Sequence, residues 1–277
     1  MRNRSALWAR GLYLAAIIFA GLGPVGCKYS AEKELARATA ARDSGDYDLA
    51  AQLYERFLQS NPIGDESVAA RLQLANLYYL NLHHYDQALT QYKEYLNQAP
   101  NASAAPVARE RMAGVLSDLG RSFEAINEYE NLNPQDETER RRIRLRIADL
   151  YFDQKNFSQA LTEYAKVSDS EPYDELSEQA YLRQASIYHL ERSQYQQALP
   201  IYQKLASATA NPRVRERTMF CIADCYAGMY NYDEAIKTLR EIKDPAEQKY
   251  IETRMTELEQ QSRESGHGAA LVKPRAH

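Results

Sequence analysis

Histidine and glycine are scarce in this chain, and their scarcity argues against most enzyme classes. The five histidines are too few and too scattered among 277 residues to build a catalytic or metal site. The sequence has no HExxH pair, no glycine-rich phosphate loop and no nucleophile elbow. Its carboxylates occur mainly beside lysine and arginine at helical spacing. We therefore expect no catalytic residue, no metal, no cofactor and no small-molecule substrate.

An excess of positive charge is also lacking. The chain has 34 basic and 38 acidic residues and a net charge of −4. Without the first 26 residues, which contain three arginines and no acid, the balance is 31 to 38, or −7. An acidic chain is a poor candidate for binding nucleic acid. With 44% hydrophobic and 26% charged residues, it is neither disordered nor a multi-span membrane protein.

The N-terminal segment is the one long apolar stretch. Arg2, Arg4 and Arg10 come before or at the start of GLYLAAIIFAGLG, which is followed by PVGC. A basic start, about a dozen apolar residues and a small-residue cleavage region describe a secretory signal. The run is short for a bilayer span, which needs about 20 apolar residues. We therefore predict a signal segment over residues 1–26.

A short motif recurs six times along the rest of the chain. It consists of an aromatic residue, then an alanine within a few positions, then an aromatic or aliphatic residue four positions after the alanine. Successive alanines lie 35 to 38 residues apart. A period in this range indicates a stacked repeat array, in which each unit buries its apolar face against its neighbours. We name these positions the marker alanines: Ala50, Ala88, Ala125, Ala160, Ala198 and Ala235.

A second helix is expected before each marker alanine. About twelve residues upstream lies another alanine, usually followed three residues on by Tyr or Leu. Small residues let two helix axes approach closely. Proline cannot continue a helix, so prolines near the ends of the repeats mark their boundaries. The upstream alanines are Ala38, Ala75, Ala113, Ala148, Ala185 and Ala223.

These features resemble the tetratricopeptide repeat, a helix–turn–helix unit. The resemblance implies an all-α fold, a right-handed α-solenoid of about six helical hairpins with a C-terminal capping helix. The period is mostly longer than the usual 34 residues, with the extra residues in connections. The expected domain is 27–264, followed by a flexible tail over 265–277. Its expected repeats are 31–62, 66–100, 104–134, 137–172, 174–212 and 213–245, with a capping helix over 246–264.

Cys27 follows the signal segment in a context that resembles the lipobox of bacterial lipoproteins, although Pro24 stands where leucine is usual. The resemblance implies cleavage before Cys27, acylation of its thiol, including palmitate, and anchoring in a membrane. Several acyl chains give stable anchoring where one is marginal. Lys28 after the cysteine implies the outer membrane, with the chain on its periplasmic face. The alternative is a plain cleaved signal or an uncleaved anchor, with Cys27 a bystander.

Long repeats on a secreted, lipidated chain resemble the BamD/CpoB-type outer-membrane lipoproteins with tetratricopeptide repeats. The resemblance implies a non-catalytic periplasmic scaffold that docks other envelope proteins, in its most specific form during outer-membrane protein assembly. Two alternatives remain open. One is a coordinator of cell-wall synthesis or Tol–Pal function, and the other is a pilotin-like factor for secretin or pilus assembly.

In tetratricopeptide repeat proteins the residues next to the first-helix alanine line the concave groove. Transferred by position, the resemblance implies a groove suited to a peptide of mixed character; the alternative is that these are ordinary solvated helix positions. Leu72 and Leu145 stand where a carboxylate clamp needs a base, so we expect no clamp. The candidate partner-binding residues are Asn76, Tyr79, Arg142, Asp149, Phe152, Asp153, Ser186, His189 and Asp224.

Two further features leave alternatives open. The arginine-rich run over 140–146 would either dock an acidic partner segment or form a solvated helix paired with the acids around it. Cys221 and Cys225 lie four apart on one expected helix and have no histidine at ligand spacing. We expect buried thiols there, with an oxidised pair or a disulfide to a partner as the alternative.

Overall fold

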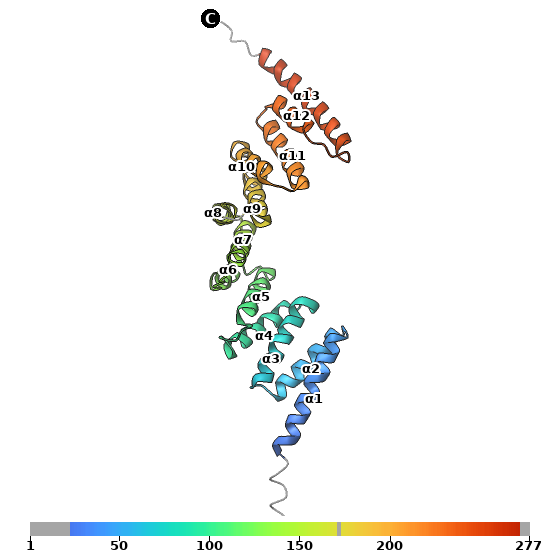
Figure 1. Ribbon diagram of the computed structural model, residues 1–277, viewed down its shortest axis with the longest axis vertical. Coiled ribbons are helices and arrows are strands. Elements are labelled where there is room, and N and C mark those ends of the chain that lie inside the picture. The colour runs from blue at the N-terminus through green and yellow to red at the C-terminus, as the bar shows by residue number, and fades with distance from the viewer. Residues whose placement is uncertain (1–22, 171–172, 272–277) are drawn as a thin grey trace, which may run out of the picture. The chain divides into compact units, whose positions relative to one another are not determined.

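A computed structural model of the protein describes residues 23–170 and 173–271, with side chains for 30–170 and 173–265. In these ranges thirteen α-helices and two π-helical segments are joined by short turns, and there is no strand (Figure 1). The helices pair into six successive hairpins with one further helix at the end. The predicted all-α class of six hairpins and a capping helix is confirmed.

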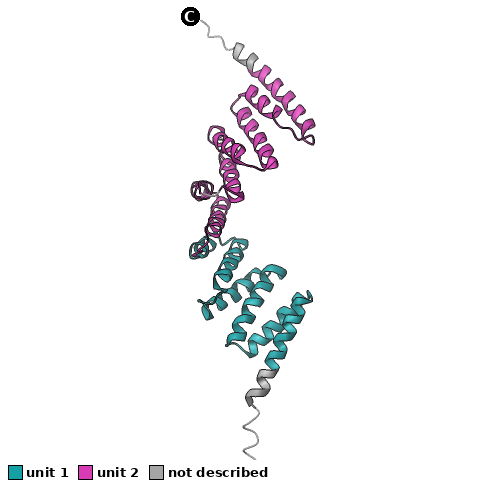
Figure 2. Ribbon diagram, in the orientation of Figure 1, with its two compact units in different colours: residues 1–132 teal, residues 133–277 magenta. Residues whose placement is uncertain are grey.

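The hairpins divide into two compact units, which meet in the sequence between Leu132 and Asn133 (Figure 2). In each unit every helix packs against the next one along the chain. The first unit comprises α1 (Gly23–Asp43) with α2 (Tyr47–Ser60), α3 (Asp65–Leu77) extended by η1 (Tyr78–Leu82) with α4 (Tyr85–Gln98), and α5 (Ala105–Asp118) with α6 (Ser122–Glu130).

The second unit has the same organisation and carries the last helix. It comprises α7 (Glu137–Asp153) with α8 (Phe157–Ser168), α9 (Glu175–Ser186) extended by η2 (Ile187–Glu191) with α10 (Tyr195–Ala208), α11 (Pro212–Gly228) with α12 (Tyr232–Arg240), and α13 (Gln248–Leu271).

The helix bounds differ from the expected domain limits at both ends. Helix α1 begins at Gly23, before the expected cleavage point, and α13 runs to Leu271, where we expected a loose tail from Ser265. Most of the expected signal segment and the side chain of Cys27 lie outside the described residues. Among the described residues, no helix combines the length and apolar character that crossing a bilayer requires.

The marker alanines explain the close packing of each hairpin. All six have no exposed surface, and the upstream alanines of the first helices are at most 2% exposed. Methyl-sized side chains at both positions let the two helices approach closely. Tyrosines then fill the layers between hairpins, and Tyr54, Tyr92 and Tyr164 are among the largest fully buried side chains. The repeated alanines therefore set the helix spacing, and tyrosines provide most of the aromatic core.

The turn inside each hairpin has one residue with positive φ, always five positions before the marker alanine. Glycine takes this place in two hairpins, and non-glycine residues take it in four. The following backbone N–H closes the first helix, as in the bond from the N–H of Asn156 to the carbonyl of Tyr151 at 2.9 Å. The six positions are Gly45, His83, Gly120, Lys155, Ser193 and Tyr230.

The two π-helical segments accommodate an extra residue. In hairpins two and five the first-helix alanine and the marker alanine are 13 positions apart, against 12 in the other four. The segments η1 and η2 lie between those alanines. Each ends in a backbone bond spanning six residues, from His84 to Tyr78 and from Gln194 to Tyr188, instead of five. The wider turn absorbs the insertion and keeps the turn and second helix in register.

Candidate functional site

An open groove of about 520 Å³ lies in the second unit, mainly between first helices α7, α9 with η2, and α11. We call it the second-unit groove. Three candidate residues line it, namely Asp149 and Phe152 on α7 and Ser186 on α9. Residues beside the first-helix alanines of α7 and α9 therefore face this groove, and partner binding by them stays a prediction. The remaining lining residues are Leu145, Gln179, Leu182, Arg183, Leu190, Glu191, Tyr202, Arg217 and Cys221.

Asp149 is held by the protein itself. Its Oδ1 atom accepts a hydrogen bond of 2.5 Å from the hydroxyl of Tyr164 on α8, and Arg183 Nε on α9 lies 3.6 Å from the same oxygen. Burial of the Tyr164 ring, and the hydrogen bond to Asp149, raise the pKa of that hydroxyl above its usual value. Asp149 therefore links its own hairpin to the next one, and its carboxylate faces the groove already partnered.

The equivalent candidate residues make the same kind of link elsewhere. In the first unit, Asn76 Oδ1 accepts a hydrogen bond of 2.7 Å from the hydroxyl of Tyr92 and one of 2.6 Å from Arg111 Nη1. In the second unit, Asp224 Oδ1 lies 3.5 Å from Arg254 Nη2 on α13. This position thus carries contacts between successive hairpins.

Aromatic candidate residues pack against the turn at the end of their helix. The Tyr79 ring lies 6.3 Å from that of Tyr85, and the Phe152 ring lies 5.7 Å from that of Phe157. The Tyr79 hydroxyl also occupies the space beside Gly114 on α5, because a β-carbon added there would lie 2.6 Å from it. Burial, reinforced by the nearby Asp118 carboxylate, raises the pKa of Tyr79 to about 12. Tyr79 is therefore a packing residue between hairpins two and three.

His189 and Asp153 do not line the second-unit groove. The His189 ring packs edge-on against Tyr195 at 5.6 Å and Tyr202 at 6.0 Å. Burial lowers the pKa of His189, although the nearby Asp224 carboxylate opposes that shift. Asp153 is exposed on the last turn of α7. The candidate set therefore separates into groove-lining residues and residues that pack or face solvent.

The arginine-rich run is mostly paired within the chain. Arg140 pairs with Glu137, Arg142 with Glu139 at 2.5 Å, and Arg144 with Glu163 at 3.2 Å. Arg142 does not line the second-unit groove. These ion pairs favour the interpretation as an internally paired helix over a continuous docking surface for an acidic segment.

Arg141 in the same run is a buried structural residue, only 2% exposed. It donates hydrogen bonds of 2.7 and 2.8 Å to the Asp174 carboxylate and one of 2.7 Å to Ser177 Oγ. Sequence patterns did not separate it from its neighbours, because all five arginines follow the same local charge pattern. Its place two residues before the buried Ile143 is a weak signal.

Both described cysteines carry free thiols. Cys225 is fully buried, and burial raises its pKa to about 12. Burial also raises the pKa of Cys221, which is partly exposed and lines the second-unit groove. No cluster of three or more potential metal ligands exists among the described residues. The prediction of buried, unpaired thiols is confirmed for Cys225 and holds in part for Cys221.

Several groove residues were not predicted from the sequence. Apart from Arg142 and Leu145, which precede Ala148 by a turn or so, the prediction used positions just after the first-helix alanine. Leu182 and Cys221 lie three and two positions before theirs. Residues three and four apart share one face of a helix. Counting back one turn from each alanine would have found them. Leu190 follows the predicted Ser186 by four positions, so counting one turn forward would have found it as well.

Comparison with solved structures identifies the fold. A tetratricopeptide repeat protein from Parabacteroides merdae matches with a TM-score of 0.54 and 19% identity, covering 85% of this chain and 89% of its own. The C-terminal part of a repeat protein of the same kind from Cytophaga hutchinsonii matches with a TM-score of 0.57 and 17% identity, covering 75% of this chain and 77% of its own.

The sequence itself matches no family model and no curated protein. At such low identity the structural matches establish the fold and nothing about partners. The chain has the fold of a tetratricopeptide repeat protein.

Proposed function

We propose that this chain is a non-catalytic scaffold at the periplasmic face of the outer membrane, where it docks other envelope proteins. The second-unit groove is the observation that carries the proposal. It is open to solvent, about 520 Å³ in volume, and built from the first helices of three consecutive hairpins. A rigid concave surface made by stacked hairpins is the usual binding surface of such arrays.

The chemistry of the groove suits protein partners. Its lining combines leucines and aromatic rings with arginine, glutamine, serine and carboxylate groups. Interfaces between proteins have this mixture of an apolar centre and polar surroundings. The Asp149 carboxylate is held in place by the hydroxyl of Tyr164, which suits a defined recognition surface. In its most specific form, the proposed role is in assembling outer-membrane proteins, as the resemblance to BamD/CpoB-type lipoproteins implies.

Membrane attachment through acylated Cys27 is the second part of the proposal. A Cys27→Ser variant is expected to move from the detergent phase to the aqueous phase, because it lacks the thiol that carries the acyl chains. Phase partitioning in Triton X-114 and the mass of the mature N-terminal peptide measure this directly. Unchanged partitioning of the variant would exclude the lipid anchor.

The docking function is tested separately from the anchor. The full chain would be purified by affinity from membranes in mild detergent, and the bound proteins identified by mass spectrometry. We expect outer-membrane or periplasmic proteins to be retained by the wild type and lost with a Phe152→Ala, Ser186→Arg variant of the groove. Recovery of the same proteins by both forms would place the docking surface elsewhere, and recovery of no envelope protein would contradict the scaffold.

A further inference from the structure

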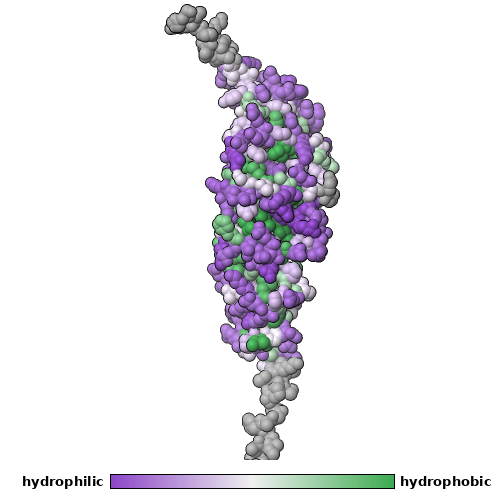
Figure 3. All heavy atoms as spheres, turned by 90° about the vertical axis from the view of Figure 1, so that its left-hand side faces the viewer, coloured by the Kyte–Doolittle hydropathy of each residue, from purple (hydrophilic) through white to green (hydrophobic). Residues whose placement is uncertain are grey.

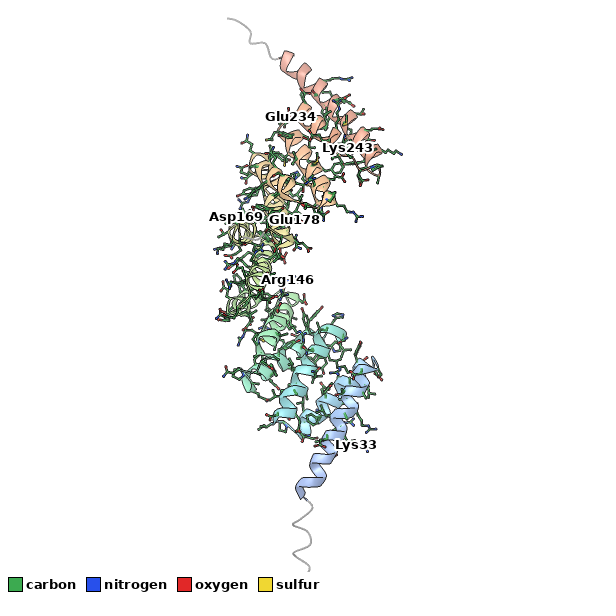
Figure 4. All side chains as sticks on the ribbon, in the orientation of Figure 1. Lys33, Arg146, Asp169, Glu178, Glu234 and Lys243 are labelled. Carbon is green, nitrogen blue, oxygen red and sulfur yellow. The ribbon has the colours of Figure 1, made fainter. Side chains whose placement is uncertain are left out.

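Three successive first helices of the second unit each carry an arginine that the fold engages weakly or not at all. Arg146 on α7 and Arg217 on α11 are exposed, and neither makes a hydrogen bond or ion pair among the described residues. Arg146 projects from its helix in Figure 4. Arg183 on α9 occupies the position equivalent to Arg146, two residues before the first-helix alanine.

The single ion pair of Arg183 is weak. Its Nε atom lies 3.6 Å from Asp149 Oδ1, and that oxygen already accepts the Tyr164 hydroxyl at 2.5 Å. The Arg183 side chain is 55% exposed. Solvent-exposed pairs of this kind contribute little to stability. Arg183 can therefore turn toward an incoming anion at little cost.

Apolar side chains share the second-unit groove with two of these arginines, Arg183 and Arg217, whereas Arg146 does not line it. Leu145, Leu182 and the Tyr202 ring line the same groove as Arg183 and Arg217. Leu190 in η2 also lines the groove, and its side chain is 69% exposed. Apolar patches lie among charged side chains on the molecular face in Figure 3. An exposed leucine beside an apolar floor is the part of the groove that a partner would cover.

We propose, on the basis of the scaffold function above, that the second-unit groove binds a peptide segment in which carboxylates flank an aliphatic side chain. The carboxylates bind Arg183 and Arg217, and the aliphatic side chain packs on Leu145, Leu182 and Leu190. A guanidinium donates two parallel hydrogen bonds to a carboxylate, which gives the contact direction as well as energy. The apolar floor favours a peptide over a phosphate or sugar, neither of which would bury it.

Glu191 at the groove adds specificity to this assignment. Its exposed carboxylate repels a uniformly acidic segment but leaves room for one or two acids placed next to the arginines. The groove is thus expected to reject polyglutamate as well as basic peptides. It selects a mixed acidic and aliphatic sequence.

A displayed library of random nonapeptides, selected on the full chain in mild detergent, tests this assignment. We expect selected sequences to be enriched in Asp or Glu next to Leu, Ile or Val. The most enriched peptide, synthesised with a fluorescent label, should bind at least ten times more weakly to Arg217→Glu and to Leu190→Asn in an anisotropy titration. Its affinity should also fall as salt rises, because exposed charge pairs are screened.

Matched variants control for charge and for the π-helical segment. Arg240→Glu makes the same charge change on second helix α12, and Leu80→Asn changes the exposed leucine of η1 in the first unit. Both should bind the peptide as the wild type does. Circular dichroism confirms folding of all four variants.

Other outcomes overturn the assignment. The assignment fails if neutral or basic sequences are enriched, or if wild type and Arg217→Glu bind the peptide equally well. It also fails if Arg217 is needed for binding to anionic lipid vesicles but not for binding to any selected peptide. If envelope proteins still co-purify with the Arg217→Glu variant, the scaffold function stands and only this choice of ligand fails. If no envelope protein co-purifies with the wild type, the function fails independently of the peptide result.

Discussion

At the scale of single residues, Arg141 links two hairpins of the second unit through a buried guanidinium. It is buried on α7 and reaches the Asp174 carboxylate, which also caps α9 by accepting the backbone N–H of Ser177 at 3.1 Å. Burial alone would raise the pKa of Asp174. The hydrogen bonds from Arg141 and from the Ser177 backbone outweigh burial and hold the pKa below its usual value.

Replacing Asp174 by Asn should be strongly destabilising. The change leaves a guanidinium that is 2% exposed without its counter-charge, and breaking a buried pair from one side costs about 3–5 kcal/mol. Urea unfolding measures the loss. Arg140→Gln is the control, because its pair with Glu137 is exposed and should contribute less than about 1 kcal/mol. Equal effects of the two substitutions would contradict the structural role of the buried pair.

The same pair gives a pH dependence of known sign. Because the pKa of Asp174 is lower in the folded chain than in the unfolded one, its stabilisation is complete above the unfolded pKa, at about 4. The stabilisation is lost as pH falls through the lower, folded value. Wild type and the Asp174→Asn variant should therefore approach each other in stability only in acid.

A second residue-scale prediction concerns Lys155, an exposed residue with φ of 58°. A side chain in the left-handed region costs about 1–2 kcal/mol, and glycine avoids this at an entropic cost of about 0.5–1 kcal/mol. Lys155→Gly should therefore stabilise the protein by roughly 0.5–1 kcal/mol. Lys155→Ala keeps the strain and should give no gain. Thermal unfolding compares the two, and a matching gain in both would point to loss of the charge as the cause.

At the scale of elements, the sequence predicts helices better than it predicts the turns between them. The alternation of alanine and aromatic residues identifies every hairpin, because close helix packing demands small residues at Ala88 or Ala160 regardless of context. The turns have no such requirement. Left-handed backbone at His83 or Ser193 is stabilised by the flanking helices, so neither position requires glycine. The sequence does not predict the π-helical segments either, because the inserted residue changes only the spacing between the two alanines of a hairpin, from 12 to 13.

Removing one residue from a π-helical segment should leave the hairpin folded. Deletion of Asn81, which is exposed in η1, restores the 12-residue spacing that four hairpins already have. The segment should become α-helical, with stability within about 1 kcal/mol of the wild type. Deletion of Asp153 from the end of α7 is the matched control, because it would reduce the regular spacing of 12 between Ala148 and Ala160 to 11 and bring α8 out of register with α7. Urea unfolding of both proteins measures the difference. Severe destabilisation by loss of Asn81 would mean that the wider turn itself is required.

At the scale of the whole molecule, the predicted groove and the observed groove overlap only in part. Asp149, Phe152 and Ser186, beside or one turn after a first-helix alanine, line the second-unit groove, and their role in binding stays a prediction. Asn76 and Asp224, at the equivalent position of other hairpins, contact an arginine of the following hairpin or capping helix and do not line this groove. A repeat sequence reports the position within a hairpin, but not which neighbouring side chain reaches that position. Which side chain of a neighbouring hairpin reaches a given position depends on how the hairpins stack, and only the folded structure shows it.

The capping helix provides the last and most general prediction, because in a stacked array each hairpin is stabilised by its immediate neighbours. Ile251 and Leu258 of α13 are 3% and 1% exposed and pack on Ile236 and Leu239 of α12. Ending the chain after Glu247 removes these contacts, and each buried aliphatic side chain is worth about 1.5–3 kcal/mol.

Hydrogen exchange should then show loss of protection in α12 and α11, with little change in α7 and α8 two hairpins away. A chain ending after Ser265 retains both buried residues and should exchange like the full chain. Uniform loss of protection across residues 133–247 would show instead that the second unit unfolds as one cooperative block, and that nearest-neighbour stacking does not describe its stability.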